Sequence, residues 1–217
     1  MIDFHHVTKR FGDELALDDV SIHVSQGELV VLLGASGTGK STFLKLISFE
    51  ERPTTGEVVV GSWRSSTARA AQVQRLRRRL GIIYQDFKLL PDRTVFENVA
   101  LPLRVAGAAS SELHRRVEAA LERVGLARHG AKRLSQISGG QQQRVAVARA
   151  LVHRPDVVLA DEPTGNLDPD MSQAMMELFR QLRSEGTAVV LATYDLSLIQ
   201  PGDRVVRLER ARLVEGA

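Results

Sequence analysis

Short apolar runs recur along the chain, separated by stretches with helical spacing. They occupy residues 28–33, 80–84, 157–160 and 188–192. Apolar residues at consecutive positions are typical of strands that are buried on both faces, as in a parallel sheet covered by helices. The sequence therefore predicts an α/β fold with a mainly parallel core sheet.

A second group of segments alternates between apolar and polar residues. Residues 2–7, 16–24 and 57–60 have this pattern, which predicts antiparallel strands joined by polar turns. We expect them to form a second sheet, an antiparallel β subdomain beside the core. Residues 204–214 predict a strand, a turn near Arg210 and another strand.

The strand pattern disappears between residues 87 and 150, and apolar residues recur there at helical spacing. The positions are Val95, Val99, Leu103, Leu113, Val117, Leu121 and Val124. We interpret residues 87–150 as a helical subdomain inserted in the α/β core, with residues 1–217 forming a single domain. A further helix is expected over residues 141–152, beginning where two glycines end.

Composition narrows the cellular setting. Hydrophobic residues make up 43% of the 217 residues, which supports a packed core, and the absence of cysteine excludes disulfides and thiolate zinc sites and fits a reducing compartment. No apolar run approaches the roughly 20 residues that span a bilayer. A membrane role would therefore act through another protein. The net charge of +3 is only a weak argument for nucleic acid, and we expect no nucleic-acid partner.

One dense basic run, Arg75-Leu76-Arg77-Arg78-Arg79, falls on a predicted helix. A solvated helix face is the simpler interpretation. The alternative is contact with anionic lipid headgroups by a protein held beneath a membrane. The sequence does not distinguish these interpretations.

One stretch matches the phosphate-binding loop G-x-x-x-x-G-K-[ST], between a predicted strand and a predicted helix. In such a loop, backbone N–H groups wrap the phosphates, Lys40 neutralises the β and γ oxygens, and the Ser41 hydroxyl binds Mg²⁺. The sequence therefore predicts a nucleoside triphosphate with Mg²⁺. The loop residues are Gly34, Ala35, Ser36, Gly37, Thr38, Gly39, Lys40, Ser41 and Thr42.

Two acids, Asp161 and Glu162, directly follow the apolar run at 157–160. The carboxyl ends of parallel strands meet at one edge of a sheet, so these acids are expected beside the phosphate loop. Asp161 then suits the Mg²⁺ shell, and Glu162 suits the general base that activates the attacking water. A structural acid pair is the alternative.

A second glycine-containing segment, Ser138-Gly139-Gly140-Gln141, precedes a predicted helix. A helix start with uncovered backbone N–H groups favours anions. The segment lacks a lysine like Lys40. We therefore expect it to face a phosphate held by another protein chain.

The order of these motifs resembles that of ABC-type ATPases over essentially the whole chain. The resemblance adds Gln85, at the end of a predicted strand, and Asn166-Leu167-Asp168 after the acid pair. It implies the P-loop ABC ATPase fold and an ATP-dependent homodimer. ATP would lie between the phosphate loop of one subunit and Ser138, Gly139, Gly140 and Gln141 of the other.

The resemblance also implies roles for single residues. Phe11 is expected to stack on adenine, Gln85 to bridge Mg²⁺ or the attacking water to the helical subdomain, and Asp168 to lie in a loop at the dimer interface. The structural alternatives are a core or edge phenylalanine, a surface glutamine and a plain Asx turn.

One position departs from the family pattern. The family has a histidine after the last core strand, where this chain has Tyr194. A neutral phenol donates one hydrogen bond but cannot carry the imidazolium charge. We therefore expect normal nucleotide binding, slowed hydrolysis and a more persistent ATP-bound dimer.

Two stretches narrow the group within the family. Residues 81–103 resemble the FtsE group of bacterial cell-division ATPases, and residues 160–168 resemble that group and also the lipoprotein-release and macrolide-export ATPases. The resemblance implies an FtsX-like integral membrane partner, control of cell-wall hydrolysis in cell division, and a peripheral location on the cytoplasmic face of the plasma membrane. A helix of the partner would dock between the core and the helical subdomain. Candidate contacts are Phe87, Leu89, Leu90 and Phe96, with core packing as the alternative.

Other functions remain open. The same ATPase chemistry could serve lipoprotein or small-molecule export, and Tyr194 raises the possibility of a nucleotide-gated module that seldom hydrolyses. An ABC-type ATPase working on DNA would need a long coiled-coil insertion between the phosphate loop and Ser138, for which the sequence leaves no room.

Overall fold

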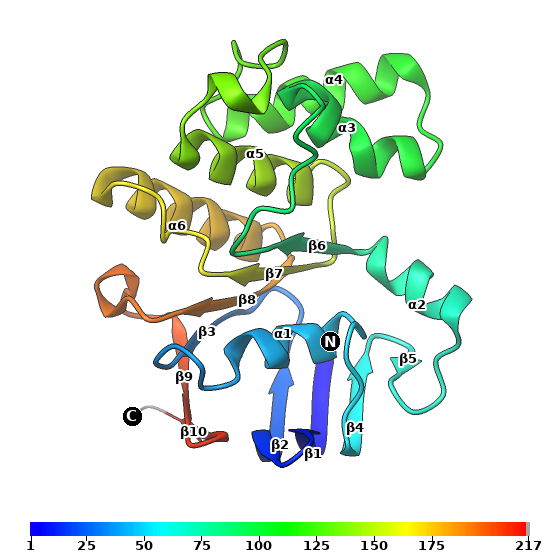
Figure 1. The fold of residues 1–217 in the computed structure, drawn as a ribbon, viewed down its shortest axis with the longest axis vertical. Coiled ribbons are helices and arrows are strands. Elements are labelled where there is room, and N and C mark those ends of the chain that lie inside the picture. The colour runs from blue at the N-terminus through cyan, green and yellow to red at the C-terminus, as the bar shows by residue number, and fades with distance from the viewer. Residues whose placement is uncertain (216–217) are drawn as a thin grey trace.

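The computed structural model describes residues 1–215 and is built around a six-stranded sheet (Figure 1). Its strand order is β10-β9-β3-β8-β7-β6, and all neighbours are parallel except the β9–β10 pair. The strands are β3 (Leu29–Leu33), β6 (Leu80–Ile83), β7 (Val157–Asp161), β8 (Ala188–Thr193), β9 (Arg204–Glu209) and β10 (Arg212–Glu215). Every residue of β3 and β8 is buried, because helices cover both faces. The predicted parallel core sheet is confirmed.

A second, antiparallel sheet has the order β2-β1-β4-β5. Its strands are β1 (Ile2–Phe11), β2 (Glu14–Val24), β4 (Thr55–Val60) and β5 (Trp63–Arg64). Helix α1 (Lys40–Ile47) lies between the two sheets in Figure 1, and Phe43 of α1 stacks on Phe4 of β1 with ring centroids 4.3 Å apart. This packing fixes the β1–β2 hairpin beside the start of α1.

Helices α3 (Val95–Val105), α4 (Ser110–Arg123) and α5 (Gly139–Leu151) gather above the core sheet (Figure 1). Helix α6 (Pro169–Ser184) lies between them and the sheet, and short 3₁₀ turns cover Leu134–Gln136 and Leu196–Leu198. The sequence predicted that the helix now labelled α5 begins at residue 141, and this prediction is wrong. Ser138 caps α5: its hydroxyl oxygen accepts from the N–H of Gln141, and the side-chain oxygen of Gln141 accepts from the N–H of Ser138. Both glycines therefore belong to the first turn of the helix.

The end of α5 crosses β6 closely. A Cβ atom on Gly81 of β6 would lie 2.4 Å from the carbonyl oxygen of Ala150, which is too close for any side chain. Glycine at this position therefore lets the helix rest directly on the edge strand.

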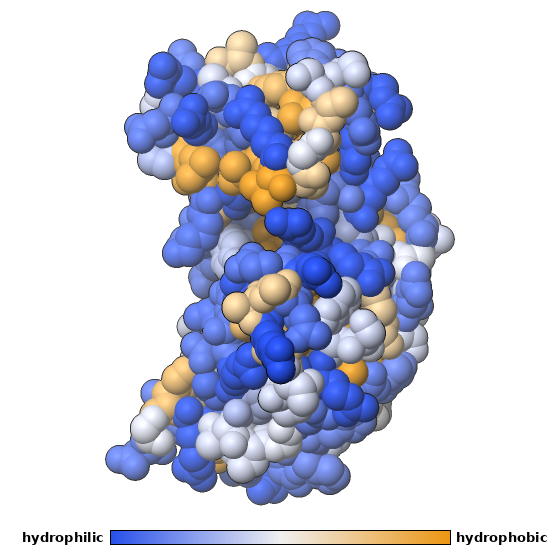
Figure 2. All heavy atoms as spheres, turned by 90° about the vertical axis from the view of Figure 1, so that its right-hand side faces the viewer, coloured by the Kyte–Doolittle hydropathy of each residue, from blue (hydrophilic) through white to orange (hydrophobic). Residues whose placement is uncertain are grey.

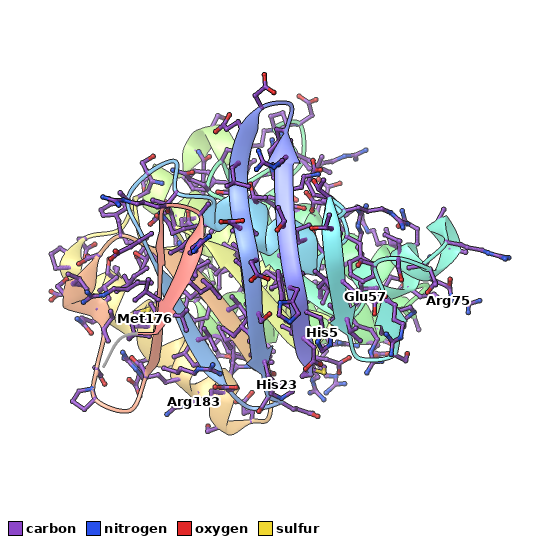
Figure 3. All side chains as sticks on the ribbon, turned by 90° about the horizontal axis from the view of Figure 1, so that it is seen from below. His5, His23, Glu57, Arg75, Met176 and Arg183 are labelled. Atoms are coloured by element: carbon purple, nitrogen blue, oxygen red, sulfur yellow. The ribbon has the colours of Figure 1, made fainter. Side chains whose placement is uncertain are left out.

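The basic run ends helix α2 (Ala70–Arg77) and leads into β6. Arg77 donates to the carbonyls of Ser48 and Phe49, and Arg79 pairs with Asp156. Arg75 and Arg78 are exposed, and Figure 3 shows Arg75 pointing away from the body of the molecule. Arg77 and Arg79 of the run therefore stabilise the fold, whereas Arg75 and Arg78 face solvent.

Within residues 1–215, no helix combines the length and apolar character needed to cross a membrane.

Candidate functional site

The phosphate-binding loop connects β3 to α1 and is closed around its own lysine. Nζ of Lys40 donates to the carbonyl oxygens of Gly34 (2.7 Å) and Ala35 (3.0 Å), and the side chain is almost fully buried. Gly39 starts α1 at φ +103°, and a Cβ there would lie 2.3 Å from the carbonyl oxygen of Ala16. Only glycine fits this turn, because it accepts positive φ and leaves room for β2.

A cavity of about 320 Å³ opens in front of the loop and gathers most of the predicted site residues. Its lining consists of Phe11, Glu14, Ala16, Ser36, Gly37, Gly39, Lys40, Ser41, Thr42, Gln85, Asp161, Glu162 and Tyr194. Three other residues of the loop, Gly34, Ala35 and Thr38, line a second cavity together with Tyr194 and Leu196. The sequence did not point to Glu14 or Ala16, because they enter the site only through the docking of the β1–β2 hairpin on the loop.

Glu162 lies at the tip of β7 in a backbone conformation that is unusual for a side-chain-bearing residue. Its φ is +48°, and its N–H donates to the carbonyl of Ala192 on β8. This corner aims the carboxylate at Lys40, with Oε1 3.5 Å from Nζ. Positive φ at a non-glycine residue is found often at functional sites, where the surrounding structure maintains the strain.

Burial raises the pKa of Glu162 above its ordinary value, and the neighbouring carboxylate of Asp161 adds to this. The charge of Lys40 and a hydrogen bond with Thr193 lower the pKa and only partly compensate. A carboxylate with a raised pKa is a stronger base. If Lys40 turned to bind phosphates, Glu162 would lose its closest counterion and its basicity would increase further.

The cavity also contains a set of oxygen donors suited to Mg²⁺. Ser41, Asp161 and Gln85 contribute a hydroxyl, a carboxylate and an amide oxygen to its lining. Among the described residues, no cluster of three or more His, Cys, Asp or Glu side chains could hold a metal without further ligands. Mg²⁺ commonly takes one or two carboxylates together with phosphate oxygens, so these residues fit Mg²⁺ that arrives with a nucleotide.

Two aromatic rings form parts of the rim. Phe11 ends β1 and is 44% exposed, with Nζ of Lys9 4.5 Å from its ring centroid. Tyr194 follows β8, is 64% exposed and borders both the cavity in front of the loop and the one behind it. Both rings are free to contact a bound molecule, and neither is a core residue.

The Ser138 segment lies outside the cavity, with the segment around Asp168 beside it. A Cβ on Gly140 would be 3.1 Å from the carbonyl oxygen of Asn166, so the two segments are in contact. Asp168 caps α6 by accepting from the N–H of Met171 at 2.9 Å. These residues are well placed for a shared outer surface, and their role toward a second subunit stays a prediction.

The segment after Gln85 is fixed by an arginine that sequence reasoning missed. Arg149 of α5 donates from Nη1 to the carbonyl of Lys88 and from Nη2 to that of Phe87, both at 2.6 Å. Phe87 and Lys88 have φ values of +61° and +48°. Burial lowers the pKa of Arg149. No motif identifies this arginine, because a charged residue in a helix usually faces solvent.

Another concave surface lies on the side of the molecule that carries α2. This α3 groove, of about 390 Å³, is lined by Gln74, Arg77, Arg78, Leu80, Ile82, Tyr84, Lys88, Leu101, Pro102, Val105, Ala106, Arg149, Ala150 and His153. Figure 2 shows an apolar band on the helical lobe with strongly hydrophilic side chains beneath it. The predicted contacts Phe87, Leu89, Leu90 and Phe96 do not line the groove, and Leu89 and Phe96 pack against the core, as their structural alternative stated.

Comparison with known proteins agrees with this architecture. A family model described as ABC transporter matches residues 17–165. Cell division ATP-binding protein FtsE of Mycobacterium tuberculosis is 44% identical over 217 residues, which cover 99% of this chain and 94% of that protein. The FtsE of Escherichia coli K12 is 47% identical over 200 residues, which cover 92% and 90%.

Solved structures show the same fold. The dimeric structure of a bacterial ABC transporter cassette has a TM-score of 0.92 and 36% identity, covering 98% of this chain and 96% of that one. A dimeric post-hydrolysis state of an ATP-binding cassette, bound to ADP and Pi, has a TM-score of 0.92 and 34% identity, covering 99% and 98%.

Proposed function

Because the chain belongs to the ABC transporter family, we propose that it binds and hydrolyses ATP in the cavity in front of its phosphate-binding loop. The observation that carries this proposal is the meeting of Lys40 and Glu162, 3.5 Å apart, in a cavity that Ser41, Gln85 and Asp161 also line. A phosphate-binding cation, a base and the ligands for Mg²⁺ then occupy one site.

The residues divide the work of hydrolysis. Lys40 leaves the carbonyls of Gly34 and Ala35 for the β- and γ-phosphates, and the loop N–H groups bind the phosphate oxygens. Ser41, Asp161 and Gln85 would hold Mg²⁺, which would supply positive charge to stabilise the phosphate oxygens. Glu162 accepts a proton from the attacking water. Phe11 is positioned for stacking on the base.

The active form in this proposal is an ATP-dependent homodimer. Gly140 lies against Asn166 and Leu167, which directly precede Asp168. None of Ser138, Gly139, Gly140, Gln141 and Asp168 lines the chain's own nucleotide cavity. The N-terminal N–H groups of α5 suit a phosphate from a second copy. The similar solved cassettes are themselves dimeric.

We assign the chain to bacterial cell division, where it would drive an FtsX-like membrane protein that controls cell-wall hydrolysis. Support comes from the FtsE proteins, which are 42–47% identical to this chain over nearly its whole length. The chain would then lie on the cytoplasmic face of the plasma membrane and bind its partner through the α3 groove.

Tyr194 limits turnover in this scheme. Its exposed ring borders the nucleotide cavity but offers only one neutral hydrogen-bond donor to the γ-phosphate. We therefore propose slow hydrolysis and a long-lived dimer.

The test combines binding, hydrolysis and assembly. The purified chain with ATP and Mg²⁺ is expected to hydrolyse slowly and to dimerise, as measured by phosphate release and light scattering. Glu162→Gln should retain ATP binding, lose phosphate release and remain a dimer. Glu177→Gln is the matched control, because Glu177 is an exposed acid on α6 outside the nucleotide cavity. Equal hydrolysis by Glu162→Gln and the original chain would remove the general-base role.

A further inference from the structure

One segment of the chain concentrates positive charge that the nucleotide chemistry does not use. The whole chain has 29 Lys and Arg against 26 Asp and Glu. Residues 58–85, the basic segment, contain six arginines and no lysine, aspartate or glutamate. The rest of the chain, with 23 basic and 26 acidic residues, is net negative. The positive excess of the protein therefore lies in this one segment, at Arg64, Arg69, Arg75, Arg77, Arg78 and Arg79.

Half of these arginines have partners within the fold. Arg64 and Arg79 each pair with an acid, and Arg77 donates to two backbone carbonyls, which leave its charge uncompensated. The other three are exposed, and no acid in the described part of the chain lies within ion-pair distance of them. They are Arg69, Arg75 and Arg78.

Helix α2 directs two of the free arginines to the same side. Arg75 and Arg78 are three positions apart, so they share a face of the helix, opposite the buried side chains of Val73 and Leu76. Figure 3 shows Arg75 pointing away from the body of the molecule. The basic segment carries no exposed large apolar side chain. This α2 face therefore suits contact with charged headgroups and not insertion into hydrocarbon.

The place of α2 in the fold fits a membrane close to this face. Arg78 also lines the α3 groove, which the proposed function assigns to the membrane partner, whereas Arg75 lies outside the groove. Figure 1 shows α2 at the edge of the molecule. A partner embedded in a membrane and bound in the groove would therefore bring the α2 face close to the surrounding lipid.

We propose that the α2 face binds the anionic headgroups of the membrane that holds the partner. The inference rests on the proposed function for the presence of that membrane, and it adds a direct contact between this chain and lipid. An anionic surface attracts the basic segment and repels the net negative remainder of the chain, so the contact also orients the molecule. A lipid surface presents many anions without a cleft, which fits arginines outside the groove. An acidic protein segment is the competing occupant, and the experiment separates the two.

Two pairs of arginines provide a matched comparison. One variant combines Arg75→Gln with Arg78→Gln, and the control combines Arg115→Gln with Arg128→Gln. Arg115 and Arg128 are likewise exposed and have no acid within ion-pair distance in the described part of the chain. Arg115, however, lies on α4, which carries three glutamates. Both variants lose two positive charges, so any difference between them reports position and not net charge.

Sedimentation of the full chain with lipid vesicles measures the binding. Vesicles of equal parts phosphatidylcholine and phosphatidylglycerol should bind the chain at low salt, and vesicles of phosphatidylcholine alone should not. High salt should release the chain, because no apolar anchor holds it. An arginine near an anionic membrane strengthens binding about fivefold, so the Arg75→Gln, Arg78→Gln variant should bind about 20-fold more weakly. Replacing both arginines by lysine instead should preserve binding, since the charge remains.

Three results would overturn the inference: binding to neither kind of vesicle, equal binding to both, or equal losses in the matched pair of variants. Fluorescence anisotropy with a labelled polyglutamate peptide tests the competing occupant. If the peptide binds and the anionic vesicles do not, the arginines serve an acidic protein segment and the lipid contact is refuted. Urea unfolding checks that every variant is folded. ATP hydrolysis is measured on the same preparations, and its absence would contradict the proposed function while leaving lipid binding as an independent result.

Discussion

Replacing Arg149 by methionine is expected to slow hydrolysis much more than it weakens ATP binding. Arg149 holds the carbonyls of Phe87 and Lys88, just beyond Gln85, through two 2.6 Å hydrogen bonds. Methionine preserves much of the side-chain volume but donates no hydrogen bond. The substitution therefore removes the anchor of the Gln85 segment and leaves the phosphate loop unchanged.

The magnitude follows from two opposing contributions. Two hydrogen bonds from a charged donor contribute roughly 3–6 kcal/mol together. Left-handed backbone at Phe87 and Lys88 costs roughly 2–4 kcal/mol together. The difference of about 1–2 kcal/mol favours the observed segment. Without Arg149 the sign reverses, so Gln85 should occupy its observed place only a small fraction of the time, and kcat should fall about tenfold or more.

The assay separates positioning from general damage. Phosphate release gives kcat, a fluorescent ATP analogue gives Kd, and urea unfolding gives stability. Arg149→Lys, which restores the positive charge and a single donor nitrogen, should recover part of kcat. Arg144→Met is the control, because Arg144 lies on the same helix and donates to the carbonyl of Val124, away from Gln85. An unchanged kcat in Arg149→Met, or equal losses in Arg149→Met and Arg144→Met, would refute the reasoning.

Four further predictions concern the nucleotide cavity. Tyr194→His should raise kcat by about tenfold or more, because it supplies a charged donor to the γ-phosphate. Tyr194→Phe is the control that removes the hydroxyl. Unchanged phosphate release in Tyr194→His would contradict slowed turnover. Because the pKa of Glu162 is raised, its active, ionised form appears only at higher pH, so the acidic limb of the kcat/KM profile should lie above the ordinary glutamate range; a limb within that range would contradict this. The raised pKa also means that ionised Glu162 destabilises the fold. Glu162→Gln should therefore gain stability relative to the original chain as pH rises through the raised pKa. Urea unfolding at several pH values measures this difference. Gly39→Ala should abolish ATP binding in the fluorescence assay, because its Cβ would overlap the Ala16 carbonyl, whereas Gly37→Ala, at positive φ but with open space around it, should lose less.

The sequence predicted those parts of the fold in which a single physical requirement determines the pattern. The runs that became β3, β7 and β8 are apolar except at their ends, because these strands are buried on both faces. The phosphate loop was recognisable because its glycine and lysine spacing has few other uses. Asp161 and Glu162 followed from their place at the end of a core strand.

Other features depended on contacts between distant segments. The role of Arg149 could not be predicted, because its two carbonyl partners lie some 60 positions earlier in the sequence. The start of α5 was predictable in principle, since a serine followed three residues later by a glutamine forms a capping box. The glycines between them were interpreted as a break. The residues of the α3 groove could not be predicted, because α2, β6 and α3 come together only in the folded chain.

Helix α5 has a mechanical consequence that neither of its ends reveals alone. Its 13 residues form a rod about 20 Å long, capped at one end by Ser138 and carrying Arg149 and Ala150 into the groove at the other. Gly81 lets the C-terminal end of this helix rest directly on the edge strand. In the proposed dimer, Ser138 touches the ATP of the opposite subunit. In that dimer, a displacement of the groove end of α5 would therefore reach the neighbour's nucleotide through one continuous helix.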